Sequence, residues 1–468
     1  MITYFPKKFA GDAAKIYLGA LAVVSIVFFS HAMSPIYIIL GIMWVVGFFL
    51  LSNRFTKEWQ ELPTKKFVTN LIYWGLAVRI VWVIFSFFFY RAKTGMPFEF
   101  AAGDSYMYHD TASWLRYESM SSVFDYLFVS GAVALSDTGY PFWLTLVYKI
   151  FGPRIFVARI VKCVISVGTC LLIYNLSRRN FGEAVGRMAG VFSMLMPNLI
   201  IYCGLHLKET EMLFLIVLFL DRADKLIHVK EYHVWTVVIP IVVVLSLFLF
   251  RTVLGAVAAL SLITAFVFTT DRVMGKAKKA MLVGWALLAV AVLAGSTIQT
   301  DVEEVWQDRG ENVVQKRNYQ SSKGNQWAKY ATGSVMAPMA LFLPYPTMVD
   351  VDAQYNQQVL HGGNYVRNFL GIFVLIAIYS AIFVKKNWRD LTLIGSFTIG
   401  YLLVISTTGF SNSERFLLPG LPGLLIMAAY GTSLINAKNL HYVRYWYVVV
   451  MAMAVGWAFF KLGSRGIF

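Results

Sequence analysis

The sequence predicts an all-α polytopic membrane protein: about 13 transmembrane helices in one bundle, with short helices lying in the membrane interface. Hydrophobic residues make up 58% of the 468 positions and charged residues only 14%, which is not the composition of a soluble globular protein. Most apolar runs approach the roughly 20 residues that span a bilayer as a helix. Basic clusters fall on alternate loops between these runs, as the positive-inside rule requires.

The charge balance does not indicate a nucleic-acid-binding protein. Lys and Arg total 41 against 25 Asp and Glu, a net charge of +16, but the basic residues lie in short loops between apolar runs. The three cysteines, Cys163, Cys170 and Cys203, all lie inside apolar segments. Neither a disulfide framework nor a zinc site is therefore predicted, and the sequence calls for no cofactor.

The N-terminal region predicts a helical hairpin that is retained in the protein. Basic residues precede the first apolar run, as in a signal peptide, but no small-residue cleavage site follows and a second run begins after Pro35. We therefore expect a cytoplasmic N-terminus. A third run at 67–90 then places residues 91–154 on the extracytoplasmic side, in a loop too long for a simple connection.

The later apolar runs continue this alternation to a C-terminus expected outside. The predicted spans are 16–33, 35–51, 67–90, 155–176, 185–204, 207–221, 234–250, 252–269, 280–298, 365–384, 391–409, 414–435 and 443–463. They define a hairpin and cytoplasmic loop (1–66), a core that holds the outer loop 91–154 (67–298), a second extracytoplasmic loop (299–363) and C-terminal helices (364–468).

The outer loop contains two apolar stretches, 122–136 and 139–151, that are too short to cross a bilayer. We expect both to be helices lying in the interface. A re-entrant hairpin is the alternative, and it leaves the topology unchanged.

The same loop carries the first long polar run, AAGDSYMYHDTASWLRYES, at 101–119. It combines carboxylates, which can take a proton from a hydroxyl, with aromatic rings, which stack on the apolar face of a sugar. Its candidate residues are Asp104, Tyr106, Tyr108, His109 and Asp110. A solvated interfacial loop with an aromatic belt is the alternative interpretation.

Ionisable residues recur at other outer corners. The corner GLHLKETEM holds His206, Lys208 and Glu209, while Arg251 and Arg415 begin or end other spans. Charges at the bilayer edge are candidates for function, and cations there can hold an anionic group. Each can equally be a snorkelling or anchoring residue at a helix end.

Together with the GYPFW stretch around Tyr140 and the late ERFLLPGLP stretch, these motifs resemble those of the GT-C glycosyltransferases. More narrowly, they are similar to those of bacterial relatives of protein mannosyltransferases and of the aminoarabinose transferase acting on lipid A. The resemblance covers about residues 67 to 435. Two departures are an extra hairpin before the first outer loop and Ser105 in place of the second acid of the mannosyltransferase Asp-Glu pair.

The resemblance implies a glycosyltransferase that moves one sugar from a polyprenyl-phosphate carrier to an acceptor hydroxyl or phosphate at the extracytoplasmic face, usually with inversion. It implies a bacterial inner-membrane location, membrane lipids as surroundings, and a glycan, lipid or protein as acceptor. It matches Asp104 to the general base and Glu209 to the second acid, with Asp110 as a further candidate.

Because they are cationic, the corner residues are assigned to binding of the donor phosphate. Because they are mostly aromatic, residues of the outer loop are assigned to binding of the sugar or acceptor. The phosphate set is Lys208, Arg251, Arg415 and His206. The sugar or acceptor set is Tyr106, Tyr108, His109 and Tyr140. A divalent metal at Asp104, His109, Asp110 and Glu209 is possible, but the loop has no Asp-x-Asp and the mechanism does not require one.

Two other functions fit the composition. An O-antigen polymerase or ligase would centre on Arg and His residues of the late loop, and therefore on Lys316, Arg317 and His361. A lipid or glycan transporter would carry charges and broken helices at mid-membrane and internal repeats, whereas the charges here lie at the ends of spans and no clear repeat is found.

Overall fold

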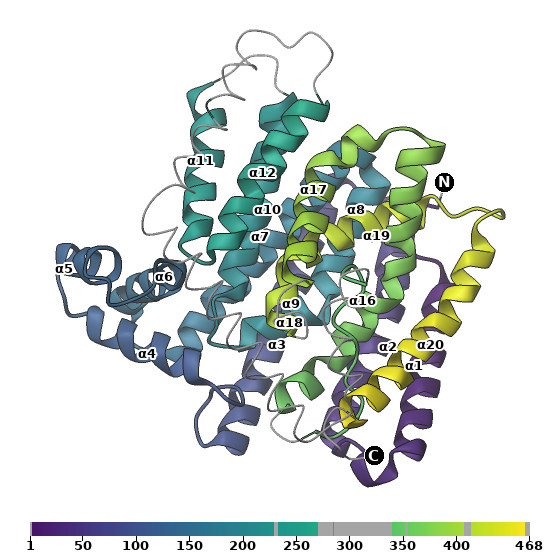
Figure 1. Cartoon of the computed structure of the whole chain (residues 1–468), viewed down its shortest axis with the longest axis horizontal. Helices are drawn as coiled ribbons and strands as arrows, with labels where there is room; N and C mark the ends of the chain where they lie inside the picture. The colour runs from purple at the N-terminus through teal and green to yellow at the C-terminus, as the bar shows by residue number, and fades with distance from the viewer. Residues whose placement is uncertain are drawn as a thin grey trace.

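The computed structural model describes residues 2–228, 233–269, 284, 339–351, 354–406 and 413–463. Within them the chain is helical, and its only β-pairing is an isolated bridge between Ala32 and Val349. The predicted all-α class is confirmed. Figure 1 shows one bundle of helices with a smaller group, α4 to α6, at one side.

The N-terminal hairpin is formed by α1 (Lys7–Val27) and α2 (Pro35–Glu58), followed by α3 (Thr64–Thr94). Pro35 occupies the first turn of α2, where its missing N–H has no helical partner to lose. Gly95, in the left-handed region at φ 82°, ends α3. The hairpin packs beside the last helix, α20 (Leu440–Gly463), so the first and last helices share one side of the bundle (Figure 1).

The outer loop folds into α4 (Gly103–Leu115), α5 (Met120–Phe124) and α6 (Leu135–Phe151), and a π-helical turn (Asp125–Val129) extends α5. The expected helix 122–136 is therefore shorter, and the expected helix 139–151 begins earlier. Figure 1 shows α4 and α6 lying across the direction of α11 and α12, the orientation expected of interfacial helices. The polar run around Asp104 is itself helical.

The central helices are α7 (Ile155–Phe181), α8 (Glu183–Leu195), α9 (Pro197–Ile201), α10 (Glu209–His228), α11 (Val234–Phe248) and α12 (Thr252–Thr269). The predicted span 185–204 is bent by 51° between α8 and α9. Pro197 has no N–H to donate to the carbonyl of Ser193. Arg79 of α3 donates to that carbonyl at 3.3 Å and to the carbonyl of Met194 at 3.1 Å, so a buried arginine supplies the missing donors.

The C-terminal helices are α16 (Tyr355–Tyr379), extended by a π-helical turn (Ser380–Val384), then α17 (Trp388–Ser406), α18 (Glu414–Leu417), α19 (Leu421–Ser433) and α20. Among the described residues, eight helices are long and apolar enough to cross a membrane, or nine if α8 and α9 form one span. Helices α10 to α12 occupy predicted spans without meeting that test, and the predicted span 280–298 lies outside the described residues apart from residue 284. The chain is an integral membrane protein.

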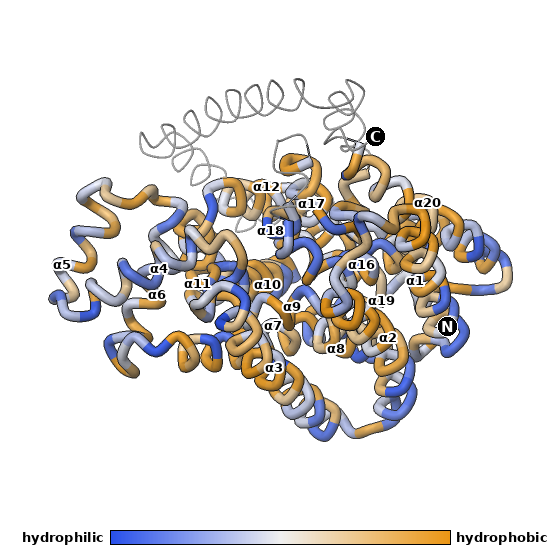
Figure 2. The backbone as a smooth tube through the Cα atoms, turned by 90° about the horizontal axis from the view of Figure 1, so that it is seen from below, coloured by the Kyte–Doolittle hydropathy of each residue, from blue (hydrophilic) through white to orange (hydrophobic). Residues whose placement is uncertain are grey.

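The surface of the bundle is apolar where lipid would surround it. Large side chains such as Phe88, Val164 and Val448 are exposed on three different helices. Figure 2 shows hydrophobic residues along the helices and hydrophilic stretches at turns and in the α4 to α6 group. Exposed apolar side chains are costly in water and favourable in a bilayer.

Contacts at the two ends of the bundle agree with the predicted alternation of loops. At one end, Asn356 donates to the carbonyl of Phe100 at 2.6 Å and the Gly139 amide donates to Leu249 at 2.9 Å. At the opposite end, Arg187 donates to the carbonyl of Gln60 at 3.0 Å. Segments predicted to share a side do lie together, while the end that faces the cytoplasm stays a prediction.

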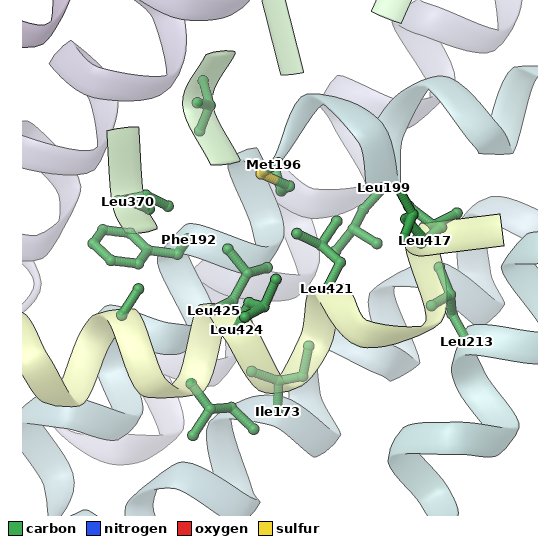
Figure 3. Close-up of a cluster of buried hydrophobic side chains, with 14 of the residues drawn as sticks. Ile173, Phe192, Met196, Leu199, Leu213, Leu370, Leu417, Leu421, Leu424 and Leu425 are labelled. Atoms are coloured by element: carbon green, nitrogen blue, oxygen red, sulfur yellow. The ribbon is translucent and has the colours of Figure 1, made fainter. Parts of the chain in front are cut away.

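The core is packed around α19, which is buried along its whole length. Figure 3 shows Leu421, Leu424 and Leu425 of this helix among side chains from other helices. Its closest approach is at Gly431, where a Cβ atom would stand 1.7 Å from the carbonyl oxygen of Phe373 in α16. Small residues permit such contact between helix backbones in membranes.

Replacing Gly431 by Ala should destabilise the protein, because α16 and α19 must separate to admit the methyl group. Overpacking of this kind costs about 1–3 kcal/mol. The matched control is Gly456→Ala in α20, where nothing lies within 4 Å of the added Cβ and helix propensity favours Ala by up to about 1 kcal/mol. Thermal unfolding in detergent compares the two, and equal melting temperatures would contradict this packing.

Candidate active site

Arg415 joins two carboxylates from distant parts of the chain. Its Nη1 pairs with Oδ2 of Asp104 in α4, and its Nε pairs with Oε1 of Glu209 at the start of α10. The Asp104 side chain is 51% exposed and the Glu209 side chain is 0% exposed. The cluster therefore extends from solvent to the interior, and the structure brings together three residues singled out from the sequence.

A second ion pair lies beside this cluster. Lys208 pairs with Oδ1 of Asp137 in the first turn of α6 and donates to the carbonyl of Ser136 at 3.0 Å. The Tyr108 hydroxyl donates to the same Asp137 oxygen at 3.1 Å. Burial alone would raise the pKa of the Asp137 carboxyl, but the Lys208 ammonium and these hydrogen bonds lower it below its ordinary value. Asp137 is therefore ionised at neutral pH.

Arg251 supports the same region from the other side. Its Nη1 donates to the Tyr401 hydroxyl at 3.0 Å, and the Tyr401 hydroxyl donates to the carbonyl of Phe416 at 2.8 Å. The Arg251 guanidinium lies 4.2 Å from the centre of the Phe416 ring. Phe416 follows Arg415 in α18, so Arg251 contacts the helix that carries Arg415. We call Lys208, Arg251 and Arg415 the cation cluster.

His109 is half-buried and His206 is fully buried, and one tyrosine lies between them. His109 Nδ1 is 2.8 Å from the Tyr148 hydroxyl, which is 3.3 Å from Nε2 of His206. Burial holds the pKa of His206 well below its ordinary value, and the cations Arg159 and Lys162 lower it further. His206 is thus neutral at neutral pH, and any contact that it makes with a phosphate would be a hydrogen bond without charge.

The remaining candidates differ in their access to solvent. Tyr106 is exposed, with its ring 4.8 Å from that of Phe98. Tyr108 and Tyr140 are buried, and their rings pack edge to face at 5.0 Å. Asp110 is exposed, and six helical positions from Asp104 place it on a different face of α4.

The sequence interpretation missed residues that hold the corner in place. Lys162 of α7 is fully buried, donates to the carbonyls of Leu205 and Leu207, and lies 3.7 Å from Glu211. Ser105 donates to Glu99 at 2.5 Å and to the carbonyl of His206 at 3.1 Å. A lysine inside an otherwise apolar span was the available signal for Lys162.

No metal-ligand set is present in the described part of the chain, where no three His, Cys, Asp or Glu side chains gather closely enough to hold an ion. The described residues therefore include no such group formed by the possible metal ligands named from the sequence, Asp104, His109, Asp110 and Glu209.

The arrangement of these helices is a GT-C fold, and the fold expected from the sequence motifs is confirmed. Among solved structures, the chain is similar to that of ArnT from Cupriavidus metallidurans bound to undecaprenyl phosphate, with a TM-score of 0.50 and 14% sequence identity. The match covers 83% of this chain and 64% of that one, and at this identity it establishes the fold alone. No protein-family model matches the chain, and no curated protein matches its sequence.

Breaking the buried ion pair between Lys162 and Glu211 should strongly lower the stability of the protein. Lys162→Met leaves the Glu211 carboxylate buried without its cation, and breaking a buried pair in this way costs about 3–5 kcal/mol. Adding Glu211→Gln should recover part of the loss, because the uncompensated charge is then gone. Thermal unfolding of both variants checks this, and an unchanged melting temperature for Lys162→Met would contradict the role of the pair.

Proposed function

We propose that the chain is a membrane glycosyltransferase that takes a sugar from a polyprenyl-phosphate carrier and transfers it to an acceptor hydroxyl or phosphate. The observation that carries the proposal is the meeting of Asp104, Glu209 and Arg415 from three distant elements at one end of the bundle. The fold shared with ArnT, whose structure holds undecaprenyl phosphate, supports a lipid-linked donor.

Asp104 is the proposed general base. In the transfer, the acceptor oxygen attacks the anomeric carbon as its proton passes to the Asp104 carboxylate, and the bond from that carbon to the phosphate oxygen breaks with its electrons going to the phosphate. The half-exposed position of Asp104 suits contact with an acceptor that arrives from solvent. Attack opposite the leaving phosphate inverts the anomeric centre.

The cation cluster is the proposed site of the leaving phosphate. Lys208, Arg251 and Arg415 can offset the charge that develops on the phosphate as the bond breaks. Glu209 pairs with Arg415 through Oε1, and its buried Oε2 accepts no hydrogen bond from the described residues. In the proposed complex, this oxygen would accept a hydrogen bond from a sugar hydroxyl that enters the site.

Aromatic residues around the cluster complete the proposed site. Tyr106 is the exposed ring and the one suited to stacking on a sugar. Buried Tyr108 and Tyr140, and half-buried His109, would line the same site. Asp110 lies on another face of α4, so we assign it no direct contact with the reacting groups.

We further propose that the site faces the extracytoplasmic side of a bacterial inner membrane, with the N-terminus cytoplasmic. Alternation of the basic loops supports this orientation. In this arrangement residues 1–66 form the N-terminal hairpin and loop, 67–298 the transferase core with outer loop 91–154, 299–363 the second outer loop and 364–468 the C-terminal helices.

No described contact favours the polymerase or ligase alternative. His361 is fully buried, with Nε2 2.8 Å from the Tyr17 hydroxyl and Nδ1 2.6 Å from the carbonyl of Gln358. This arrangement is that of a packed interior histidine. Lys316 and Arg317, the other residues of that alternative, lie outside the described residues.

Asp104→Asn keeps the size of the side chain but removes its basicity, so turnover should fall by about a hundredfold or more, as is usual for loss of a general base. Donor binding and expression should persist. Radiolabelled polyprenyl-phosphate sugars supplied to membranes measure the transfer, with Asp110→Asn as the matched control that costs less.

Two outcomes would revise this assignment. Near-normal turnover by Asp104→Asn, with activity abolished by Asp110→Asn or Glu209→Gln, would move the base to another carboxylate. Full activity in all three variants would remove the proposed mechanism.

The orientation is tested by labelling introduced cysteines with a membrane-impermeant thiol reagent on intact cells. The native cysteines are buried and give little background. Cysteines at Ser136 and at Ser321, the latter outside the described residues, should react from outside, whereas one at Thr64 should react only after permeabilisation. Opposite sidedness of Ser136 and Ser321 would contradict the proposed topology.

A further inference from the structure

Two of the cations proposed to hold the donor phosphate are already paired with carboxylates. Asp104 of α4 occupies Arg415, and Asp137 of α6 occupies Lys208. Both carboxylates belong to the segment from α4 to α6, which we call the cover segment (residues 103–151). The cations belong instead to α18 and to the corner before α10.

The carboxylates lie nearer to solvent than the cations that they pair with. The side chain of Asp137 is 38% exposed against 7% for Lys208, and that of Asp104 is 51% exposed against 22% for Arg415. An anion approaching from outside therefore meets the acidic side chains of the cover segment first.

Asp104 and Asp137 are linked to each other as well as to the cations. Tyr108 lies one helical turn after Asp104 in α4, and its hydroxyl donates to Asp137 at 3.1 Å. Its ring also packs at 5.0 Å against that of Tyr140 in α6. Tyr108 therefore ties Asp137 to the same helix that carries Asp104.

Phosphate and carboxylate compete for the same donors. The described acceptors of Lys208 are Asp137 and the carbonyl of Ser136, and Arg415 directs two of its nitrogens at carboxylates. A phosphate placed beside intact pairs would face two negative charges at close range, which is unfavourable in a partly buried site. Binding is favourable when the phosphate replaces the carboxylates.

We propose that Asp137 is a positioning residue that holds Lys208 in the free protein and is displaced by the donor phosphate, while the same phosphate displaces Asp104 from Arg415. The inference rests on the proposed function and adds to it an order in which donor and acceptor bind. Asp104 becomes available to the acceptor only after the donor has bound. A carboxylate released from an arginine is also a better proton acceptor than one paired with it.

The experiment measures binding of undecaprenyl phosphate to the purified full-length chain in detergent. Asp137→Asn removes the competing charge, so this lipid should bind about threefold to tenfold more tightly, a gain of roughly 0.6–1.4 kcal/mol. In a Lys208→Ala background, Asp137→Asn should change the affinity little, because the contested cation is absent. A residue with only a structural role would not produce tighter binding that depends on Lys208.

Further variants separate charge from folding. Asp137→Ser, a second neutral replacement, should bind as tightly as Asp137→Asn, whereas Asp137→Glu should bind like the wild type. Asp125→Asn is the matched control, since Asp125 is an exposed carboxylate of the cover segment with no described side-chain partner, and it should change nothing.

The outcomes distinguish this inference from the proposed function. Binding by the wild type that both neutral Asp137 variants leave unchanged or weaken would overturn the inference alone. A gain in affinity that persists in the Lys208→Ala background would also overturn it. Absence of binding by the wild type would overturn the proposed donor and this inference together.

Discussion

The guanidinium of Arg415 pairs with two carboxylates at once, and the rest of the site depends on this contact. The contact is possible only when the elements that carry the two carboxylates meet around the arginine. Asp104 is 311 residues and Glu209 is 206 residues from Arg415 in sequence. The outer loop, the corner before α10 and the turn that begins α18 must therefore all reach the same end of the bundle. Alternate crossing of the membrane by apolar helices brings them there.

The corner that carries Lys208 and Glu209 is held in place by buried hydrogen bonds. Lys162 donates to the carbonyls on either side of His206, and Ser105 donates to the carbonyl of His206 itself. Backbone groups that would otherwise be unsatisfied at the membrane boundary thus become the attachment points of the site. The charged residues at the surface of the site depend on this buried polar layer for their positions.

The sequence predicted the helices well because length and hydrophobicity are local properties. Wherever residues are described, each predicted span overlaps a helix or a bent pair, although α1 and α16 begin about ten residues earlier than predicted and α10 to α12 are short or rich in charge. Asp104, Glu209 and Arg415 were found because each interrupts or ends an apolar run at a predicted outer corner. Their mutual contact was not predicted, because no single-sequence pattern establishes which of these residues meet.

Asp137 and Lys162 were missed for physical reasons. Asp137 lies between two apolar stretches, where a lone acid is typical of a loop, and its partner Lys208 is 71 residues away. Lys162 lies inside a span, and only the packing of α7 against the corner decides whether it faces lipid, solvent or backbone carbonyls. Long-range pairing of charges depends on which helix faces meet, and this information is not carried by hydrophobic periodicity.

The bend between α8 and α9 affects how the parts of the site are connected. Arg79 binds the carbonyls freed at the bend, and it belongs to α3, whose far end leads directly into the polypeptide that carries Asp104. After the bend, α9 and the turn Tyr202–Gly204 lead to the corner that holds His206. One buried arginine thus joins α3, which precedes the segment that carries Asp104, to the bent helix pair that precedes the corner of Lys208 and Glu209, so that both parts of the candidate site are connected inside the bundle.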